Sequence, residues 1–246
     1  MPRWIDVFRL GLVQTALGSI VVLCTSTMNR VMVVELGLAA MLPGLLVGLH
    51  YAVQLSRPRW GHDSDVGGRR TPWILGGMAV LGVGGVLAAA SIALVEQSLA
   101  AGLALMVFSY LLVGVGVGAA GTSLLAMLAT YVPEGRRAGA ASTVWLMMIM
   151  GFVITAGTVG SLLDPFTPLR LVTITASVAG IAFVLSALAL FRIERRLERK
   201  QDTEEKVPFR EALRDVWQDD KARAFTVFVF VSMLAYSAQD LILEPC

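Results

Sequence analysis

One histidine, His50, lies inside a long apolar stretch of the sequence and is the side chain there best suited to chemistry. A neutral imidazole can bind a metal or take part in hydrogen bonds. Polar groups are costly inside a membrane, so each one suggests a functional role by default. The ordinary alternative is a hydrogen bond to a neighbouring helix, or to Tyr51 or Gln54 nearby. Both interpretations stay open at this point.

A second candidate is the charged segment 57–72, RPRWGHDSDVGGRRTP, which separates two apolar runs. Within it, two glycines and three charged residues have the spacing G-x-x-x-D-x-x-G-R-R. They are Gly61, Asp65, Gly68, Arg69 and Arg70. Glycine tolerates positive φ, so the spacing predicts a tight turn with a charged frame.

The end of this segment carries signals for the start of a helix. We expect Thr71 to cap that helix and Pro72 to occupy its first turn. We expect Asp65 to pair with one of the surrounding arginines, and the arginine pair to anchor at an anionic membrane surface.

Several other polar side chains could line a cavity or act in gating. Gln14 lies in an apolar run, and Asp240 and Glu244 are one helical turn apart near the C-terminus. Asn29 and Arg30 lie near Glu35, and the simplest expectation is an ion pair between Arg30 and Glu35. Packing is the ordinary alternative for Gln14.

The sequence carries no enzyme signature. It has no phosphate-binding loop and no recognisable pairing of a nucleophile with a base, so we expect no catalytic activity. Two histidines and two distant cysteines do not predict a metal ion site or a disulfide framework. A net charge of +2 is too small to indicate a nucleic-acid partner.

The elements that position these residues are apolar helices. The chain is 56% hydrophobic and 15% charged, against roughly 25% charged in soluble domains. Uncharged runs long enough to suggest membrane crossing, at about 20 residues each, number seven. They cover 10–28, 36–56, 71–95, 97–133, 138–163, 171–191 and 224–239. The longest, 97–133, is expected to begin with a turn. The chain is therefore predicted to be an all-α membrane protein.

Lysine and arginine predict the orientation of these helices. The gaps between successive predicted helices alternate between the two sides of the membrane. Of the 20 basic residues, only Arg30 and Arg170 lie on the side opposite the N-terminus. Positive residues concentrate on the cytoplasmic side, so we expect a cytoplasmic N-terminus. The same pattern predicts three parts: a six-helix bundle over 1–192, a charged cytoplasmic linker with an amphipathic helix over 193–222, and a seventh membrane helix over 223–246.

The charged segment resembles the signature loop between the second and third helices of the major facilitator superfamily, G-x-x-x-D-(R/K)-x-G-R-(R/K). Val66 departs from that pattern, because a basic residue is usual there. The segment 132–142, VPEGRRAGAAS, also resembles the superfamily's loop after helix 4. The resemblance implies a major-facilitator-like six-helix N-terminal bundle followed by the start of a second half.

A narrower resemblance is to the PucC/LhaA, or bacteriochlorophyll delivery, branch of that superfamily. The stretches that carry it are FRLGL at 8–12, MNRVM at 28–32, LHYA at 49–52, GHDSD at 61–65 with GGRRTP at 67–72, and QDLILEP at 239–245. It implies a multi-pass protein of the bacterial inner membrane, either cytoplasmic or intracytoplasmic and photosynthetic, that assembles light-harvesting complexes.

On this resemblance, bacteriochlorophyll is the expected cofactor or cargo, and His50 is the candidate ligand for its magnesium. The implied partners are the lipid bilayer and antenna polypeptides or the reaction-centre complex. The alternative function is a secondary transporter of a small solute. Members of the branch have about twelve helices, so we expect the chain to be a fragment or a naturally short form; a lone half could self-associate.

Overall fold

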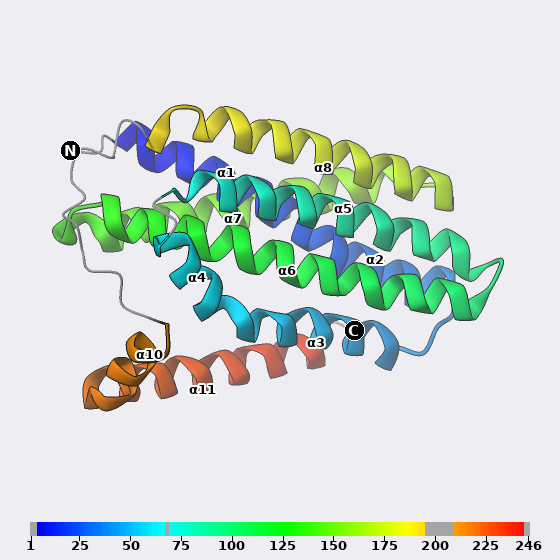
Figure 1. The fold of residues 1–246 in the computed structure, drawn as a ribbon. Coiled ribbons are helices and arrows are strands. Elements are labelled where there is room, and N and C mark those ends of the chain that lie inside the picture. The colour runs from blue at the N-terminus through cyan, green and yellow to red at the C-terminus, as the bar shows by residue number, and fades with distance from the viewer. Residues whose placement is uncertain (1–3, 67–68, 195–208, 244–246) are drawn as a thin grey trace. The chain divides into compact units, whose positions relative to one another are not determined.

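The computed structural model describes residues 4–66, 69–194 and 209–243, and within these the side chains of 63–66, 209–210, 212, 216 and 233–243 are not described. The described residues form helices joined by short connections (Figure 1). They fall into two compact units, Met1–Lys200 and Gln201–Cys246. The prediction of an all-α protein is confirmed.

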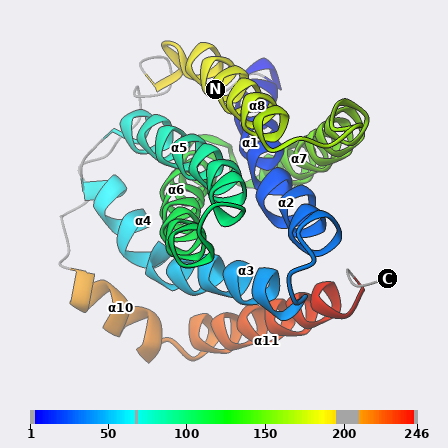
Figure 2. The same ribbon diagram turned by 90° about the vertical axis from the view of Figure 1, so that its right-hand side faces the viewer.

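The first unit is a bundle of long helices and shorter ones. Its helices are α1 (Trp4–Val22), α2 (Met28–Arg30), α3 (Met41–Val53), α4 (Arg57–Val66), α5 (Thr71–Val95), α6 (Leu99–Tyr131), α7 (Glu134–Leu162) and α8 (Pro168–Leu190). Viewed along the bundle, α6 lies beside α5 and α3, and α1 lies beside α7 and α8 (Figure 2).

Five helical segments of this unit are long and apolar enough to cross a membrane. They are Trp4–Glu35, Thr71–Val95, Leu99–Tyr131, Glu134–Leu162 and Pro168–Leu190. The expected turn before the longest run is present, and the Ser98 hydroxyl accepts a hydrogen bond from the Ala101 amide at 3.4 Å. These features establish a multi-pass membrane protein.

One of the seven expected crossings differs from the sequence expectation. In the described residues, 36–56 does not form a segment that meets the same criteria of length and apolarity. It instead contains α3, which is 13 residues long. This helix continues through a 3₁₀ turn at Gln54–Ser56 directly into α4, which carries the charged residues. The run 224–239 lies within a 24-residue helix, but the side chains of 233–243 lie outside the described residues, so its membrane crossing stays a prediction.

The continuous helical run from Met41 to Val66 corrects the prediction of a tight turn over the charged segment. Gly61 lies inside α4, and the only glycine with positive φ in the described residues is Gly37. Hydrogen-bonded helix therefore replaces turn geometry over the first ten residues of the segment. The break in the helix comes only after Val66.

Glycines let the helices approach one another closely. A Cβ on Gly77 of α5 would lie 2.5 Å from the Ala120 amide nitrogen of α6, and one on Gly116 would lie equally close to that of Leu81. In a membrane no hydrophobic effect drives helices together, so close backbone packing supplies the attraction. Gly77 and Gly116 therefore act as packing residues between α5 and α6.

The bent helical run of α3 and α4 also packs against glycines of α6. A Cβ on Gly114 would lie 2.8 Å from the His50 carbonyl oxygen, and a Cβ on Gly118 would overlap the Trp60 indole. The seating of α3 and α4 against α6 therefore depends on these two positions having no side chain.

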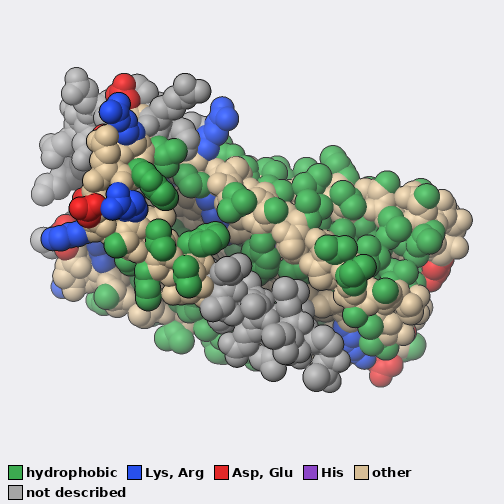
Figure 3. Space-filling view, turned by 90° about the horizontal axis from the view of Figure 1, so that it is seen from below, with side chains coloured by type: hydrophobic (Ala, Val, Ile, Leu, Met, Phe, Trp, Pro, Cys, Tyr) green, Lys and Arg blue, Asp and Glu red, His purple; other side chains and the backbone are tan. Residues whose placement is uncertain are grey.

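The outer faces of α7 and α8 carry large apolar side chains. Leu146 and Val153 on α7 are each 62% exposed, and Ile181 and Leu188 on α8 are each more than two-thirds exposed. Figure 3 views the molecule from the side away from α8, and hydrophobic side chains are prominent on that face too. Such faces suit contact with lipid.

The second unit contains α10 (Phe209–Gln218) and α11 (Asp220–Leu243). On α10, Leu213 and Trp217 are four residues apart and both about half exposed. A helix that presents such residues on one face suits a membrane surface. Asp219 accepts hydrogen bonds from the Lys221 and Ala222 amides at 2.8 and 3.2 Å and so caps the start of α11.

Candidate functional site

Arg70 is the most engaged residue of the charged segment. It is 9% exposed, and its Nη1 donates hydrogen bonds to the Ala126 carbonyl oxygen and the Thr130 hydroxyl of α6, each at 2.7 Å. A planar guanidinium can hold two acceptors at once in a fixed geometry, which an ammonium group does less well. Arg70 thus ties the start of α5 to the end of α6.

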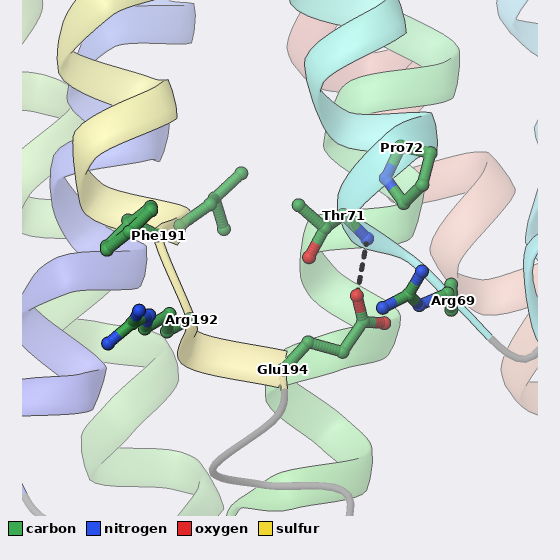
Figure 4. Close-up of a pocket in the computed structure, with 7 residues that line it drawn as sticks. Arg69, Thr71, Pro72, Phe191, Arg192 and Glu194 are labelled. Atoms are coloured by element: carbon green, nitrogen blue, oxygen red, sulfur yellow. Dashed lines mark hydrogen bonds between the residues drawn. The ribbon is translucent and has the colours of Figure 1, made fainter.

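The start of α5 is capped from a distance by Glu194, which follows the end of α8 (Figure 4). Its carboxylate accepts hydrogen bonds from the Arg70 amide at 2.5 Å and the Thr71 amide at 3.3 Å. These amides are among the unpaired donors at a helix N-terminus, where a negative charge is also favoured by the helix dipole.

The prediction that Thr71 caps this helix is therefore wrong. Thr71 is its first residue, Arg70 occupies the cap position, and the Thr71 hydroxyl is buried without a hydrogen-bond partner among the described residues. A carboxylate from a remote residue satisfies the amides instead. Pro72 lies in the first turn, as expected.

Gly61 has a packing role on the face of α4 that meets α6. A Cβ at this position would lie 3.2 Å from Thr122 Cγ2, closer than ordinary van der Waals contact. Arg69 lies exposed at the end of the segment. Gly68 and the side chain of Asp65 lie outside the described residues, so the expected pairing of Asp65 with an arginine stays a prediction.

The structure places His50 in the contact between α3 and α6, with 1% of its surface exposed. Its Nε2 lies 2.7 Å from the side-chain nitrogen of Gln54, one turn further along the chain. The Tyr51 ring is tilted against the imidazole with its centroid 4.7 Å away. The two neighbours considered as alternatives for His50 are thus the ones it contacts.

Gln14 is buried between α1 and α7. Its side-chain nitrogen donates to Met148 Sδ at 3.1 Å, and its carbonyl oxygen is buried with no hydrogen-bond partner among the described residues. The adjacent Thr15 hydroxyl donates to the Met147 carbonyl oxygen at 2.9 Å. In this conformation Gln14 lies in a helix contact, and a role in a polar cavity stays a prediction.

The opposite end of the bundle, here called the distal end, holds a cavity of about 390 Å³. Arg30, Glu35 and Asp164 line it, together with the hydroxyl residues Ser26 and Thr27. The helix that carries the first two is locally widened into π-helical turns at Leu23–Thr27 and Val31–Glu35. Such turns are frequent at functional sites.

Arg30 and Glu35 share this cavity, but no ion pair joins them in the described residues. The expectation of a direct Arg30–Glu35 pair is therefore wrong for this conformation. Arg30 and Glu35 are separated by the second π-helical turn, and both are exposed. Asn29 is partly buried beside Arg30.

The last two candidates lie in the second unit. Asp240 belongs to α11, but its side chain lies outside the described residues, as does all of Glu244. Their predicted role in gating or proton transfer stays a prediction.

The described residues contain no group of three or more histidine, cysteine or acidic side chains that could hold a metal ion. A magnesium pigment would need only one axial ligand, for which His50 is the candidate. In this conformation the imidazole is buried and its Nε2 contacts Gln54, so the residues present do not fit a macrocycle at that position.

Two important residues were not singled out by sequence reasoning. Glu194 was counted only as part of a charged linker, although the pattern Arg-Ile-Glu directly after an apolar run could have suggested a capping role. Asp164 was not among the candidate residues. Its position beside Arg30 depends on the pairing of α1 with α7, which sequence spacing does not reveal.

The fold and these sites define a multi-pass helical membrane protein whose charged segment lies at one end of the bundle. The family model described as "PUCC protein" matches residues 27–246. The chain therefore belongs to the PUCC protein family, and the narrower resemblance drawn from the sequence, to the PucC/LhaA branch, is confirmed. The resemblance to the major facilitator superfamily stays a prediction.

The relatives agree with this assignment. The chain is 53% identical over 242 residues to the "Bacteriochlorophyll synthase 44.5 kDa chain" of Rhodobacter capsulatus, covering 98% of this chain and 56% of that protein. It is 29% identical to "Protein PucC" of Cereibacter sphaeroides, over 96% of this chain and 54% of that protein. It is 28% identical to "Protein PucC" of Rhodobacter capsulatus, over 96% and 55%.

The chain spans about half the length of the curated relatives it matches. No solved structure matches it significantly.

Proposed function

We propose that this chain is part of a membrane-integral assembly factor for bacterial light-harvesting complexes, one that binds bacteriochlorophyll or delivers it to antenna polypeptides. The observation that carries the proposal is the 53% identity, over nearly the whole chain, to a protein named as a bacteriochlorophyll synthase chain. Membership of the PUCC protein family and the multi-pass helical fold support it.

The word synthase in the name of that relative raises the question of catalysis. We propose a non-catalytic role, because the sequence carries no enzyme signature and the candidate side chains Gln14 and His50 each lie in a helix contact. The proposed location is the bacterial inner membrane, cytoplasmic or intracytoplasmic, with the N-terminus in the cytoplasm. The proposed partners are antenna polypeptides or the reaction-centre complex.

The test is purification of the chain in mild detergent from phototrophic cells. We expect a near-infrared absorbance band of bacteriochlorophyll and co-purifying antenna polypeptides. A matched preparation of an unrelated multi-pass protein from the same cells controls for adventitious pigment. Pigment and polypeptide levels no higher than in that control would contradict the proposal and favour the secondary transporter as the alternative.

A separate variant tests the pigment ligand. His50→Ala removes the imidazole, whereas Gln54→Ala leaves it and removes its 2.7 Å neighbour. If His50 ligates pigment after a local rearrangement, His50→Ala loses the absorbance band and Gln54→Ala keeps it. Full pigment content in His50→Ala would eliminate this ligand without affecting the assembly proposal.

A further inference from the structure

A second cavity lies where the start of α5 meets the end of α8 (Figure 4). Its volume is about 380 Å³, and its lining includes Arg69, Thr71, Phe191, Arg192 and Glu194. Glu194 is the only acidic residue in this lining, and its two oxygens are taken by backbone amides. Two arginines and only one carboxylate line the cavity, so its net charge is positive.

The donors around this cavity have no partners among the described residues. The Arg69 guanidinium makes no hydrogen bond or ion pair there, and the Thr71 hydroxyl oxygen is buried without a partner. The Arg192 guanidinium carbon lies 5.1 Å from the centroid of the Phe191 ring. Figure 4 shows Arg69 and Thr71 on one side of the cavity and Arg192 on the other side, turned away from them. A free guanidinium such as that of Arg69 suits a phosphate group.

The backbone holds one of these arginines in an uncommon conformation. Arg192 has φ of 57°, in the left-handed region that a residue with a side chain rarely adopts. The preceding residue is fixed by Arg9 of α1, whose Nη2 donates to the Phe191 carbonyl oxygen at 2.6 Å. Such strain persists when the surrounding structure over-determines it, and it is enriched at ligand sites.

An apolar groove of about 420 Å³ lies further along the same two helices. Its walls include Ala79, Gly82 and Val83 of α5, and Gly180 and Phe183 of α8. A Cβ on Gly180 would meet nothing within 4 Å, so the groove is open beside that residue.

An exposed stripe on α5 joins the cavity to the groove. Pro72, Gly76, Ala79 and Val83 are three or four residues apart and are all exposed. At 1.5 Å per residue the stripe is roughly 16 Å long, which is the scale of an acyl chain. A charged cavity at the end of a membrane helix, continued by an apolar groove, has the polarity of a phospholipid.

We propose that the α5–α8 seam binds an anionic phospholipid, with its phosphate at Arg69 and an acyl chain in the groove beside Gly180. The anionic charge of the lipid complements the two arginines that line the cavity. In the predicted orientation, the cytoplasmic leaflet would supply this lipid. The site would hold one lipid at the bundle surface and would fix the end of α8 against α5.

The test measures lipid retained by the full chain after washing in detergent, by native mass spectrometry, with phosphatidylglycerol or phosphatidylcholine added. We expect one phosphatidylglycerol per chain and little phosphatidylcholine. Arg69→Gln should weaken retention by about tenfold, because it removes a charge-assisted contact to phosphate. The matched control Arg136→Gln removes an exposed arginine elsewhere and should change nothing.

A second pair of variants tests the groove. It also provides an independent test if Arg69→Gln fails to fold. Gly180→Leu should displace the acyl chain and lower retention, whereas Gly157→Leu, also in open space but on α7, should not. Equal retention of both lipids, or equal retention by each variant and its control, would overturn the proposal. Displacement of lipid by millimolar inorganic phosphate alone would also overturn it and indicate a site for soluble phosphate.

Discussion

The charged residues at the two ends of the bundle make different kinds of contact. At the motif end, which comprises α4, Arg70 and Glu194, buried or half-buried charges are tied to backbone groups of α5 and α6. At the distal end, Arg30, Glu35 and Asp164 face an open cavity. Arg70 and Glu194 form a fixed joint between helices at the motif end. At the distal end, no ion pair in the described residues holds any of the three charged side chains.

This difference has a consequence for function. A joint made of capped helix ends and close glycine contacts holds one arrangement, because each contact leaves a buried group unsatisfied when it breaks. An open group of charges beside π-helical turns can change partners at little cost. We therefore expect the helix joint at the motif end to be rigid and the charged residues of the distal end to rearrange more easily.

The largest expected effect is a steric block at the motif end. Gly118→Leu would drive a side chain into the Trp60 indole and separate α4 from α6. Overpacking of this kind should lower the free energy of unfolding by about 3 kcal/mol or more. The measurement is unfolding in detergent micelles, followed by tryptophan fluorescence.

The matched control is Gly160→Leu at the distal end, where a Cβ meets nothing within 4 Å. It should change the free energy of unfolding by about 0.5 kcal/mol or less. Equal losses in both variants would contradict the contrast between the two ends.

The second effect is loss of the remote cap. Glu194→Ala leaves the Arg70 and Thr71 amides without their acceptor and should cost about 2 kcal/mol of unfolding free energy. Glu134→Ala removes a carboxylate that is 88% exposed and pairs with Arg137 at 3.5 Å, so it should have little effect. If Glu194→Ala is as stable as that control, the capping role is wrong.

The third effect concerns the shape of the Arg70 side chain. Arg70→Lys keeps the charge but not the planar group that reaches both Ala126 and Thr130, and should cost about 1 kcal/mol. The same exchange at the exposed Arg137 serves as the comparison. A stability equal to that of the unmodified chain would show that charge alone matters at position 70.

The smallest effect on stability is expected at the distal end. Arg30→Gln should change the unfolding free energy by about 0.5 kcal/mol or less, because the guanidinium is exposed and has no ion pair among the described residues. If the distal end acts in binding, the same variant should still reduce co-purification of antenna polypeptides. A large loss of stability would place Arg30 in the fixed framework instead.

Much of the fold could be predicted from the sequence. Long uncharged runs predict membrane helices, since a backbone in lipid must satisfy its own hydrogen bonds, and five such helices are present. The limits of the charged segment were harder to predict. Glycine-rich spacing suggested a turn, but α4 continues as helix to Val66 because Gly61 and Trp60 pack against α6.

The candidate site was predictable only in part. Arg70 was identified from its spacing, whereas its partners Ala126 and Thr130 lie more than fifty residues away. His50 was found as an isolated polar residue, but its contact with Gln54 could be offered only as one alternative. The cap on α5 was assigned to the nearest suitable residue, Thr71, although the carboxylate that performs it is Glu194.

The sequence by itself determined the class of protein, the positions of most membrane helices and the family, because these depend on local apolarity and on the order of residues along the chain. Only the tertiary structure decided which charges meet. Glu194 reaches α5, and Asp164 joins Arg30 at one cavity, because α8 packs on α5 and α7 packs on α1. Helix pairing is a long-range property, set by the fit of glycine-lined surfaces that no single stretch of sequence contains.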